Sequence, residues 1–197
     1  MIDLIFKAIE KAENQLTARL KETEEKSEVK TQLKTTEEIK KAAEIIGVGA
    51  IKYYDLKQNR RSNYAFSYSK MLDPKGNTAV YLLYAYARLC SILRKANFTD
   101  EMINLLKDFK IINKYEKELC IQLLLFPDIV SMALEDMEIN RICDYIYDLS
   151  GKFSEFYTEC RVIGGENSES RIYMVYLVRE MMGVCFNILG LKALTKI

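Results

Sequence analysis

The spacing of apolar residues is the feature that most limits what this sequence can fold into. These residues recur about every three to four positions along most of the chain, and no stretch alternates apolar and polar residues as a strand does. The sequence therefore predicts an all-α fold. The expected helices span 2–26, 35–56, 76–95, 100–123, 127–137, 139–162 and 169–189, with loops at 27–34, 57–75 and 164–168.

Short local signals mark where some of these helices begin, end or approach a neighbour. Thr35 and Glu38 form a capping box before the second helix, and Gly190 follows the last helix in the C′ position. Gly47 and Gly49 interrupt the second helix, each at a cost of about 1 kcal/mol relative to alanine. We expect such glycines where another helix packs closely against the backbone.

The helix expected at 76–95 has two distinct faces, and either Asn77 or Thr78 caps its start. Its apolar stripe consists of Leu82, Leu83, Tyr86, Leu89, Cys90 and Leu93. The other face carries two tyrosines and two cations within about 60° of one another, namely Tyr81, Tyr84, Arg88 and Lys95. Aromatic rings beside cations suit the stacking of unpaired bases next to a phosphate chain. The alternative is that the tyrosines are half-buried packing residues and the cations are simply solvated.

The segment before this helix is rich in cations and aromatic rings and lacks helical periodicity. Five cations and one carboxylate give it a net charge of +4, from Lys57, Arg60, Arg61, Lys70 and Lys75 against Asp73. Three aromatic residues lie among them, Tyr64, Phe66 and Tyr68. Long ordered loops of this kind are uncommon and are often functional. RNA contact through Arg60, Arg61 and Lys70 and simple packing against a neighbouring domain are equally compatible with the pattern.

Composition excludes most catalytic and metal sites. The chain has no histidine, which removes the usual general base and histidine-ligated zinc, and it contains no phosphate-binding glycine loop. Its five cysteines are widely spaced, which is typical of reduced, buried thiols in a cytosolic protein. No apolar run reaches the roughly 18 residues of a membrane span, and no signal peptide opens the chain. A net charge of +1 leaves only local clusters to bind nucleic acid.

Several separated motifs, in order and in register, resemble one known family. The longest is NYAFSYSKMLDPKGNTAVYLLYAYAR at 63–88, preceded by GAIKYYDL at 49–56. Later matches are FP at 126–127, CDYIYDL at 143–149, FSEFY at 153–157 and NILGLK at 187–192. Together these residues resemble the C-terminal part of the class I arginyl-tRNA synthetases, especially the cytosolic eukaryotic type. The resemblance covers essentially the whole chain.

The resemblance implies a fold and an activity. Residues 77–197 are expected to form the family's helical anticodon-binding bundle. Residues 1–76 are expected to be the remainder of the catalytic or stem-contact region, with two linker helices and the loop 57–76. The family uses ATP to attach arginine to its tRNA for protein biosynthesis, in the cytoplasm. Its catalytic half carries the signatures H-I-G-H and K-M-S-K-S, and neither is present here. We therefore expect ATP and Mg²⁺ to bind outside this chain, which needs no cofactor and is inactive alone.

The resemblance also implies partners and binding residues. The partners are arginine tRNA, through its anticodon loop and above all its middle cytosine, and the protein's own catalytic domain; neither a membrane nor DNA is expected. Tyr81, Tyr84 and Arg88 match positions that meet the splayed anticodon bases, Tyr157 matches another aromatic on the anticodon side, and the C-terminal residue, here Ile197, reaches the loop. Arg161 lies where the family varies and is a weaker candidate, whereas Lys95 is a candidate because it shares a helix face with Arg88. The chain departs from the family at its end, LTKI rather than a methionine after Lys-Pro, and at Ser69, which replaces a usual aspartate.

Two other interpretations remain open. A helical protein–protein interaction module would use the tyrosine stripe as a packing surface and would not bind RNA, but it has no need of the +4 loop beside a tyrosine-rich, basic helix. An unrelated protein carrying a borrowed anticodon-binding domain is the other interpretation. The match at 2–56 argues against borrowing, because that region belongs to the synthetase's own linker.

Overall fold

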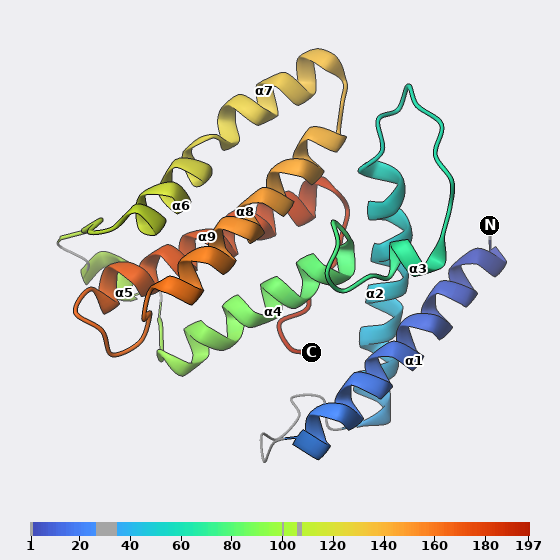
Figure 1. Ribbon diagram of the computed structural model, residues 1–197, viewed down its shortest axis with the longest axis horizontal. Helices are drawn as coiled ribbons and strands as arrows, with labels where there is room; N and C mark the ends of the chain where they lie inside the picture. The colour runs from blue at the N-terminus through green and yellow to red at the C-terminus, as the bar shows by residue number, and fades with distance from the viewer. Residues whose placement is uncertain (1, 27–34, 100, 106–107) are drawn as a thin grey trace.

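The computed structural model describes residues 2–26, 35–99, 101–105 and 108–197 (Figure 1). Within these residues every regular element is a helix, which confirms the all-α prediction. The helices are α1 (Ile2–Lys26), α2 (Thr36–Leu56), α3 (Tyr68–Met71), α4 (Ala79–Lys95), α5 (Glu101–Leu105), α6 (Lys114–Leu124), α7 (Phe126–Asp136), α8 (Asn140–Glu159) and α9 (Ser168–Ile188). The loop expected at 27–34 lies outside the described residues.

The long helices form a pair and a bundle that meet where α2 packs on α4. The pair consists of α1 and α2, which lie side by side at one end of the molecule (Figure 1). In the bundle, α4, α8 and α9 contact one another, and α6 and α7 cover α8. The C-terminal tail runs back from α9 toward α4 (Figure 1).

The α1–α2 pair is held together by small side chains. Ala8, Ala12 and Leu16 of α1 are buried against α2. A Cβ atom on Gly47 would lie 2.7 Å from the Cα atom of Ile9, so only glycine allows this approach. The prediction of close packing is confirmed at Gly47. At Gly49 it is wrong, because a Cβ atom there would meet nothing nearer than 3.8 Å.

The start of α4 is fastened to its neighbours by polar side chains. The Thr78 hydroxyl accepts a hydrogen bond from the Tyr81 amide at 3.2 Å, so Thr78 is the N-cap. Asn77 has a different role: its Oδ1 atom lies 2.6 Å from the buried Tyr53 hydroxyl, which is also 2.9 Å from the Cys143 carbonyl oxygen. Tyr53 thus joins α2, the start of α4 and α8.

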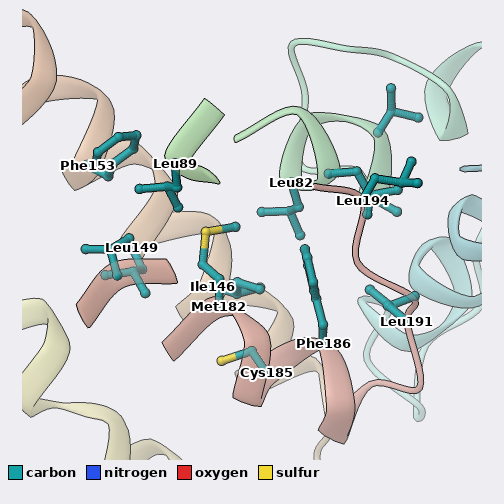
Figure 2. Packing of buried hydrophobic residues seen from close by; sticks show 14 of the residues in the cluster. Leu82, Leu89, Ile146, Leu149, Phe153, Met182, Cys185, Phe186, Leu191 and Leu194 are labelled. Atoms are coloured by element: carbon teal, nitrogen blue, oxygen red, sulfur yellow. The ribbon is translucent and has the colours of Figure 1, made fainter. Parts of the chain in front are cut away.

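A single apolar core fills the bundle. Figure 2 shows Leu82 and Leu89 of α4 pointing toward Met182 and Phe186 of α9, with side chains of α8 and the tail beside them. The residues of α8 that face inward are fully buried, namely Ile142, Cys143, Ile146, Leu149, Phe153 and Phe156. The apolar stripe of α4 is buried except for Tyr86, which is partly exposed.

The prediction of a single helix at 100–123 is wrong. The structure has α5 up to Leu105 and a separate α6 from Lys114, with a non-helical stretch at 108–113. A second capping box causes the new start: the Glu116 amide donates to Asn113 Oδ1 at 3.0 Å, and the Glu116 carboxylate accepts from the Asn113 amide at 3.2 Å. The short α3, capped by Ser67 inside the loop at 57–75, is another helix that the sequence analysis missed.

The buried Glu116 also anchors α6 to α9. Its carboxylate is fully buried and forms an ion pair with Arg171 at 2.7 Å. Burial alone would raise the pKa of Glu116, but donors from Ile112, Arg171, Asn113 and Asn167 outweigh it and lower the pKa. The carboxylate is therefore charged and structural, in the manner of a satisfied buried ion pair.

All five cysteines lie in the part of the chain that the structure describes, and each is a free thiol. Four are buried and Cys120 is partly exposed, close to the expected pattern. Among the described helices, none is long and apolar enough to cross a membrane.

Candidate functional site

A cavity of about 490 Å³ opens between α4, α8, the end of α1 and the C-terminus. Its lining residues are Arg19, Pro74, Tyr81, Tyr84, Ala85, Ala87, Arg88, Ser91, Phe153, Ser154 and Ile197. Four of the predicted site residues, Tyr81, Tyr84, Arg88 and Ile197, therefore meet here. Two arginines line the cavity, and none of its described lining residues is an aspartate or glutamate. This composition favours an anionic ligand with flat apolar surfaces.

Tyr84 is partly buried, and one face of its ring is occupied by a cation. The Arg19 guanidinium carbon lies 3.9 Å from the centre of the Tyr84 ring, a cation–π contact between α1 and α4. Burial raises the pKa of Tyr84, while Arg19 acts in the opposite direction. The ring is thus held in one orientation at the edge of the cavity.

Arg88 and Tyr81 connect the α4 face to α8. The Arg88 guanidinium carbon lies 4.7 Å from the centre of the Tyr157 ring, so the predicted Tyr157 joins the site through Arg88. Tyr81 packs edge-on against Tyr147, with ring centres 5.5 Å apart. These rings are therefore packed at one end and open to the cavity at the other. Both interpretations of the tyrosine stripe, packing and stacking, are compatible with this arrangement.

The C-terminal tail reaches the cavity because several bonds fix its path. Gly190 adopts a positive φ of 64° after α9, which turns the chain back. Lys52 then donates to the Gly190 carbonyl at 2.8 Å, and Arg94 donates to the Thr195 carbonyl at 3.0 Å. Leu194 is buried between them, and Ile197 comes to line the cavity.

The predicted residues Lys95 and Arg161 do not line the cavity. Lys95 is exposed in the last turn of α4, about two helical turns beyond Arg88. Arg161 lies just after α8, where its Nε atom donates to the Ile163 carbonyl at 3.2 Å and its own carbonyl accepts from Arg171. The structure therefore separates both from the Tyr81–Tyr84–Arg88 group.

The loop at 57–76 forms a separate aromatic cluster. Tyr64 and Phe66 pack edge-on against Tyr54 of α2, each with ring centres 5.7 Å apart, and the Tyr64 hydroxyl donates to the Asp55 carboxylate at 2.6 Å. This hydrogen bond raises the pKa of Tyr64 to about 12. Both rings remain about two-fifths exposed, at 43% and 41%.

The predicted cations of this loop lie away from the cavity. Arg60 donates to the Asp136 carbonyl at the end of α7 at 3.2 Å, whereas Arg61 and the α3 residue Lys70 are exposed on the surface. Of the residues in this segment, Pro74 lines the cavity.

Lys57 and two buried thiols have shifted pKa values and do not line the cavity. No three of the described His, Cys, Asp or Glu residues lie together as metal ligands. Burial raises the pKa of Cys143 and of Cys185 to about 12, so these thiols stay protonated near neutral pH. Lys57, which donates to the Asn77 carbonyl at 2.7 Å, has its pKa lowered by burial but serves to fasten α4.

Arg19 is the charged lining residue that the sequence does not predict. In the sequence it is one of many charged residues on the polar side of the first helix, and it lies far from 76–95 along the chain. Only the packing of α1 on α2, which in turn packs on α4, brings it to Tyr84.

Two family models match the chain. Residues 82–197 match the DALR anticodon binding domain, and residues 1–68 match the catalytic domain of class I tRNA synthetases (R). The division after residue 76 into two domains stays a prediction.

Curated relatives of similar identity come from different sources. The arginine–tRNA ligase of Cyanothece sp. is 38% identical over 98% of this chain and 32% of its own length. The chloroplastic/mitochondrial enzyme of Arabidopsis thaliana is 40% identical over 83% of this chain and 25% of its own. The cytoplasmic enzyme of Rattus norvegicus is 41% identical over 80% and 26%.

A solved structure agrees with the whole fold. The arginyl-tRNA synthetase of Plasmodium falciparum superposes with a TM-score of 0.86 at 35% identity, covering 100% of this chain and 33% of that one. The chain thus spans about a third of the length of the relatives it matches.

Proposed function

Because this chain belongs to the family of DALR anticodon-binding domains, we propose that it recognises the anticodon of arginine tRNA as the C-terminal part of an arginine–tRNA ligase. The observation that supports the proposal most strongly is the convergence of Tyr81, Tyr84, Arg19 and Arg88 on one cavity with no aspartate or glutamate among its described lining residues. Aromatic faces and guanidinium groups are the side chains on which splayed RNA bases stack.

In the proposed mechanism, binding is by stacking and charge rather than by catalysis. Anticodon bases leave their stack and lie on the rings at the cavity, at about 1–3 kcal/mol per stacked base. Arg88 contacts a phosphate or a base edge, and this part of the affinity falls as salt rises. The C-terminal residue Ile197 contributes an apolar contact at the rim. Discrimination centres on the middle cytosine, as the family resemblance implies.

The chemical step is proposed for a catalytic half outside this sequence. That half would use ATP and Mg²⁺ to activate arginine and then attach it to the tRNA. The residues of this chain do not fit such a site, since the two class I signatures and a phosphate-binding glycine loop are absent from the sequence. The role proposed for this chain is to hold the tRNA, with α1 and α2 lying in the segment that matches the catalytic-domain model.

The finer assignment, to the cytosolic eukaryotic type in the cytoplasm, stays a prediction. A cyanobacterial, an organellar and a cytoplasmic relative have nearly equal identity to this chain, at 38%, 40% and 41%. These identities support the arginine–tRNA ligase assignment without separating the types.

A second candidate, a protein–protein interaction module, is favoured by the surface of α7. None of the residues of α7, all of which the structure describes, is buried, and Leu134 is 68% exposed. Apolar patches of this kind often mark a protein contact. This contact could accompany RNA binding elsewhere on the bundle, so the two functions are compatible.

Filter binding of the chain to arginine tRNA and to a non-cognate tRNA of similar length tests the proposed function. We expect the arginine tRNA to bind at least about tenfold more tightly, with an affinity that falls linearly on logarithmic scales as salt rises. Equal and weak retention of both tRNAs would contradict the proposal and favour the interaction module.

A further inference from the structure

Arg19 links α1 to the cavity, and neither the sequence motifs nor the family resemblance assigns it a role. It belongs to the segment 1–68 that matches the catalytic-domain model, whereas the other cation at the cavity, Arg88, belongs to 82–197. Its guanidinium nevertheless lines the cavity and stacks on Tyr84 at 3.9 Å. The cavity is therefore built from both matched segments.

The position of Arg19 is set by well-packed neighbours. Leu16, one helical turn before it, is 1% exposed, and Leu20 beside it packs against the core. The close approach of Ile9 to Gly47 fixes α1 against α2. A long side chain from a helix held in this way has fewer positions to sample than a surface cation on a free helix.

The chemistry of a stacked guanidinium suits a phosphate. A guanidinium is planar and carries five N–H donors in its plane, so a ring can cover one face while the edges still donate. Arg88, the other lining cation, is stacked on Tyr157 in a similar way. Both stacked arginines line a cavity with no aspartate or glutamate among its described lining residues, and each lies beside a tyrosine.

We propose that Arg19 is an RNA-binding residue: stacked on Tyr84, it binds a phosphate of the anticodon loop through its in-plane donors. This inference rests on the proposed function. It makes α1 part of the anticodon-side surface, so that the bound loop contacts both matched segments. The competing role is structural, in which Arg19 only packs α1 against α4.

The test measures binding of the 197-residue chain to the arginine tRNA anticodon stem-loop over a range of salt concentrations, for three variants. Arg19→Ala should weaken binding roughly tenfold and lower the salt slope by about 0.7, the value for one phosphate contact of a single strand. Arg19→Lys should keep the slope but recover only part of the affinity, because an ammonium cannot stack or bind in a bidentate manner. Lys21→Ala, on the same helix and exposed, is the matched control and should change neither quantity.

The outcomes distinguish the role of Arg19 from the proposed function. A wild-type chain that binds the stem-loop, with Arg19→Ala equal to it in affinity and slope, overturns the role of Arg19 while the proposed function stands. A thermal unfolding temperature lowered in Arg19→Ala without a change in slope also overturns that role, since it indicates packing alone. A wild-type chain that does not bind the stem-loop overturns both.

Discussion

The α4 cavity and the loop at 57–76 have similar compositions and different structures. Both combine tyrosines with basic residues. At the cavity, the cations lie over ring faces, and rings and cations line one open space. In the loop, the rings pack edge-on against Tyr54 and each other. Lys57 lies over the Tyr54 ring at 5.1 Å, and Arg60 is bound to a backbone carbonyl, but these groups do not line the cavity of the α4 face.

Composition alone therefore does not identify an RNA-binding surface. A regular helix repeats its side chains on one face, so Tyr81, Tyr84 and Arg88 point in similar directions. A loop has no such repeat, and its rings pack where α2 offers them apolar surface. The cavity is consequently the stronger candidate for base stacking, and the loop cations are candidates for non-specific phosphate contact.

Replacing Tyr84 should reveal the largest difference in RNA binding between the cavity and the loop. Tyr84→Ala should weaken stem-loop binding by roughly 5- to 150-fold, the equivalent of about 1–3 kcal/mol for one stacked base. Tyr84→Phe keeps the ring and should bind nearly as well as the wild type. Fluorescence anisotropy measures the affinity, and circular dichroism checks that helicity is unchanged.

The matched control for Tyr84 is Tyr64→Ala, in the loop, which should leave the affinity within about twofold. Equal losses at Tyr84 and Tyr64 would show that the distinction between cavity and loop is wrong. A collapse of helicity in Tyr84→Ala with weak binding by Tyr84→Phe would also remove the case for a stacking platform.

Substitutions of Arg88 and Arg61 compare the roles of a cavity cation and a loop cation in RNA binding. Arg88→Ala should lower the salt slope by about 0.7 and reduce the preference for the cognate anticodon, because Arg88 lies beside the bases in the proposed complex. Arg61→Ala should at most weaken binding of all RNAs equally, by a fewfold. Titrations of both variants with cognate and base-swapped stem-loops measure this; a loss of preference in Arg61→Ala would reverse the assignment.

Tyr64 provides a smaller effect, on stability alone. Tyr64→Phe removes the hydrogen bond to Asp55, for which we expect a loss of about 1 kcal/mol in the free energy of unfolding and unchanged RNA binding. Urea unfolding at neutral pH measures it, with Tyr68→Phe as a control from the same loop.

The difference in stability between the wild type and Tyr64→Phe should depend on pH. The hydrogen bond to Asp55 raises the pKa of Tyr64 to about 12, above the value of about 10 expected when unfolded. The stabilisation is therefore complete below about pH 10 and is lost as the pH rises toward 12. The stability difference between wild type and Tyr64→Phe should shrink in that window; a constant difference would exclude the hydrogen bond as its source.

Most of the fold could be predicted because local signals and packing agree. The Thr35–Glu38 capping box and the turn at Gly190 are both present. The prediction of a single helix at 100–123 failed because of contacts that are distant in the sequence. Ser170 accepts from the Lys110 amide at 3.1 Å, and Asn167 donates to the Lys110 carbonyl at 3.0 Å. These bonds hold residue 110 outside a helix, and no local pattern reveals partners about sixty residues away.

The sequence predicts which side chains of α4 point toward the candidate site. It does not predict how far the site extends along the helix. Helical periodicity placed Lys95 on the same face as Arg88, yet seven residues along a helix amount to about 10 Å, and Lys95 lies beyond the cavity. Arg19 could not be predicted from the sequence because its contact with Tyr84 depends on tertiary packing. Periodicity indicates which residues share a face, and only the fold indicates which of them share a cavity.

Recognition of the arginine tRNA anticodon at the cavity can be measured with isolated anticodon stem-loops. One stem-loop carries the native sequence, a second has its middle cytosine replaced, and a third has two stem pairs exchanged. We predict that the cytosine change weakens binding at least about tenfold while the stem exchange has little effect, and that Tyr84→Ala abolishes this difference. Equal binding of all three stem-loops by the wild-type chain would be incompatible with anticodon recognition at this cavity.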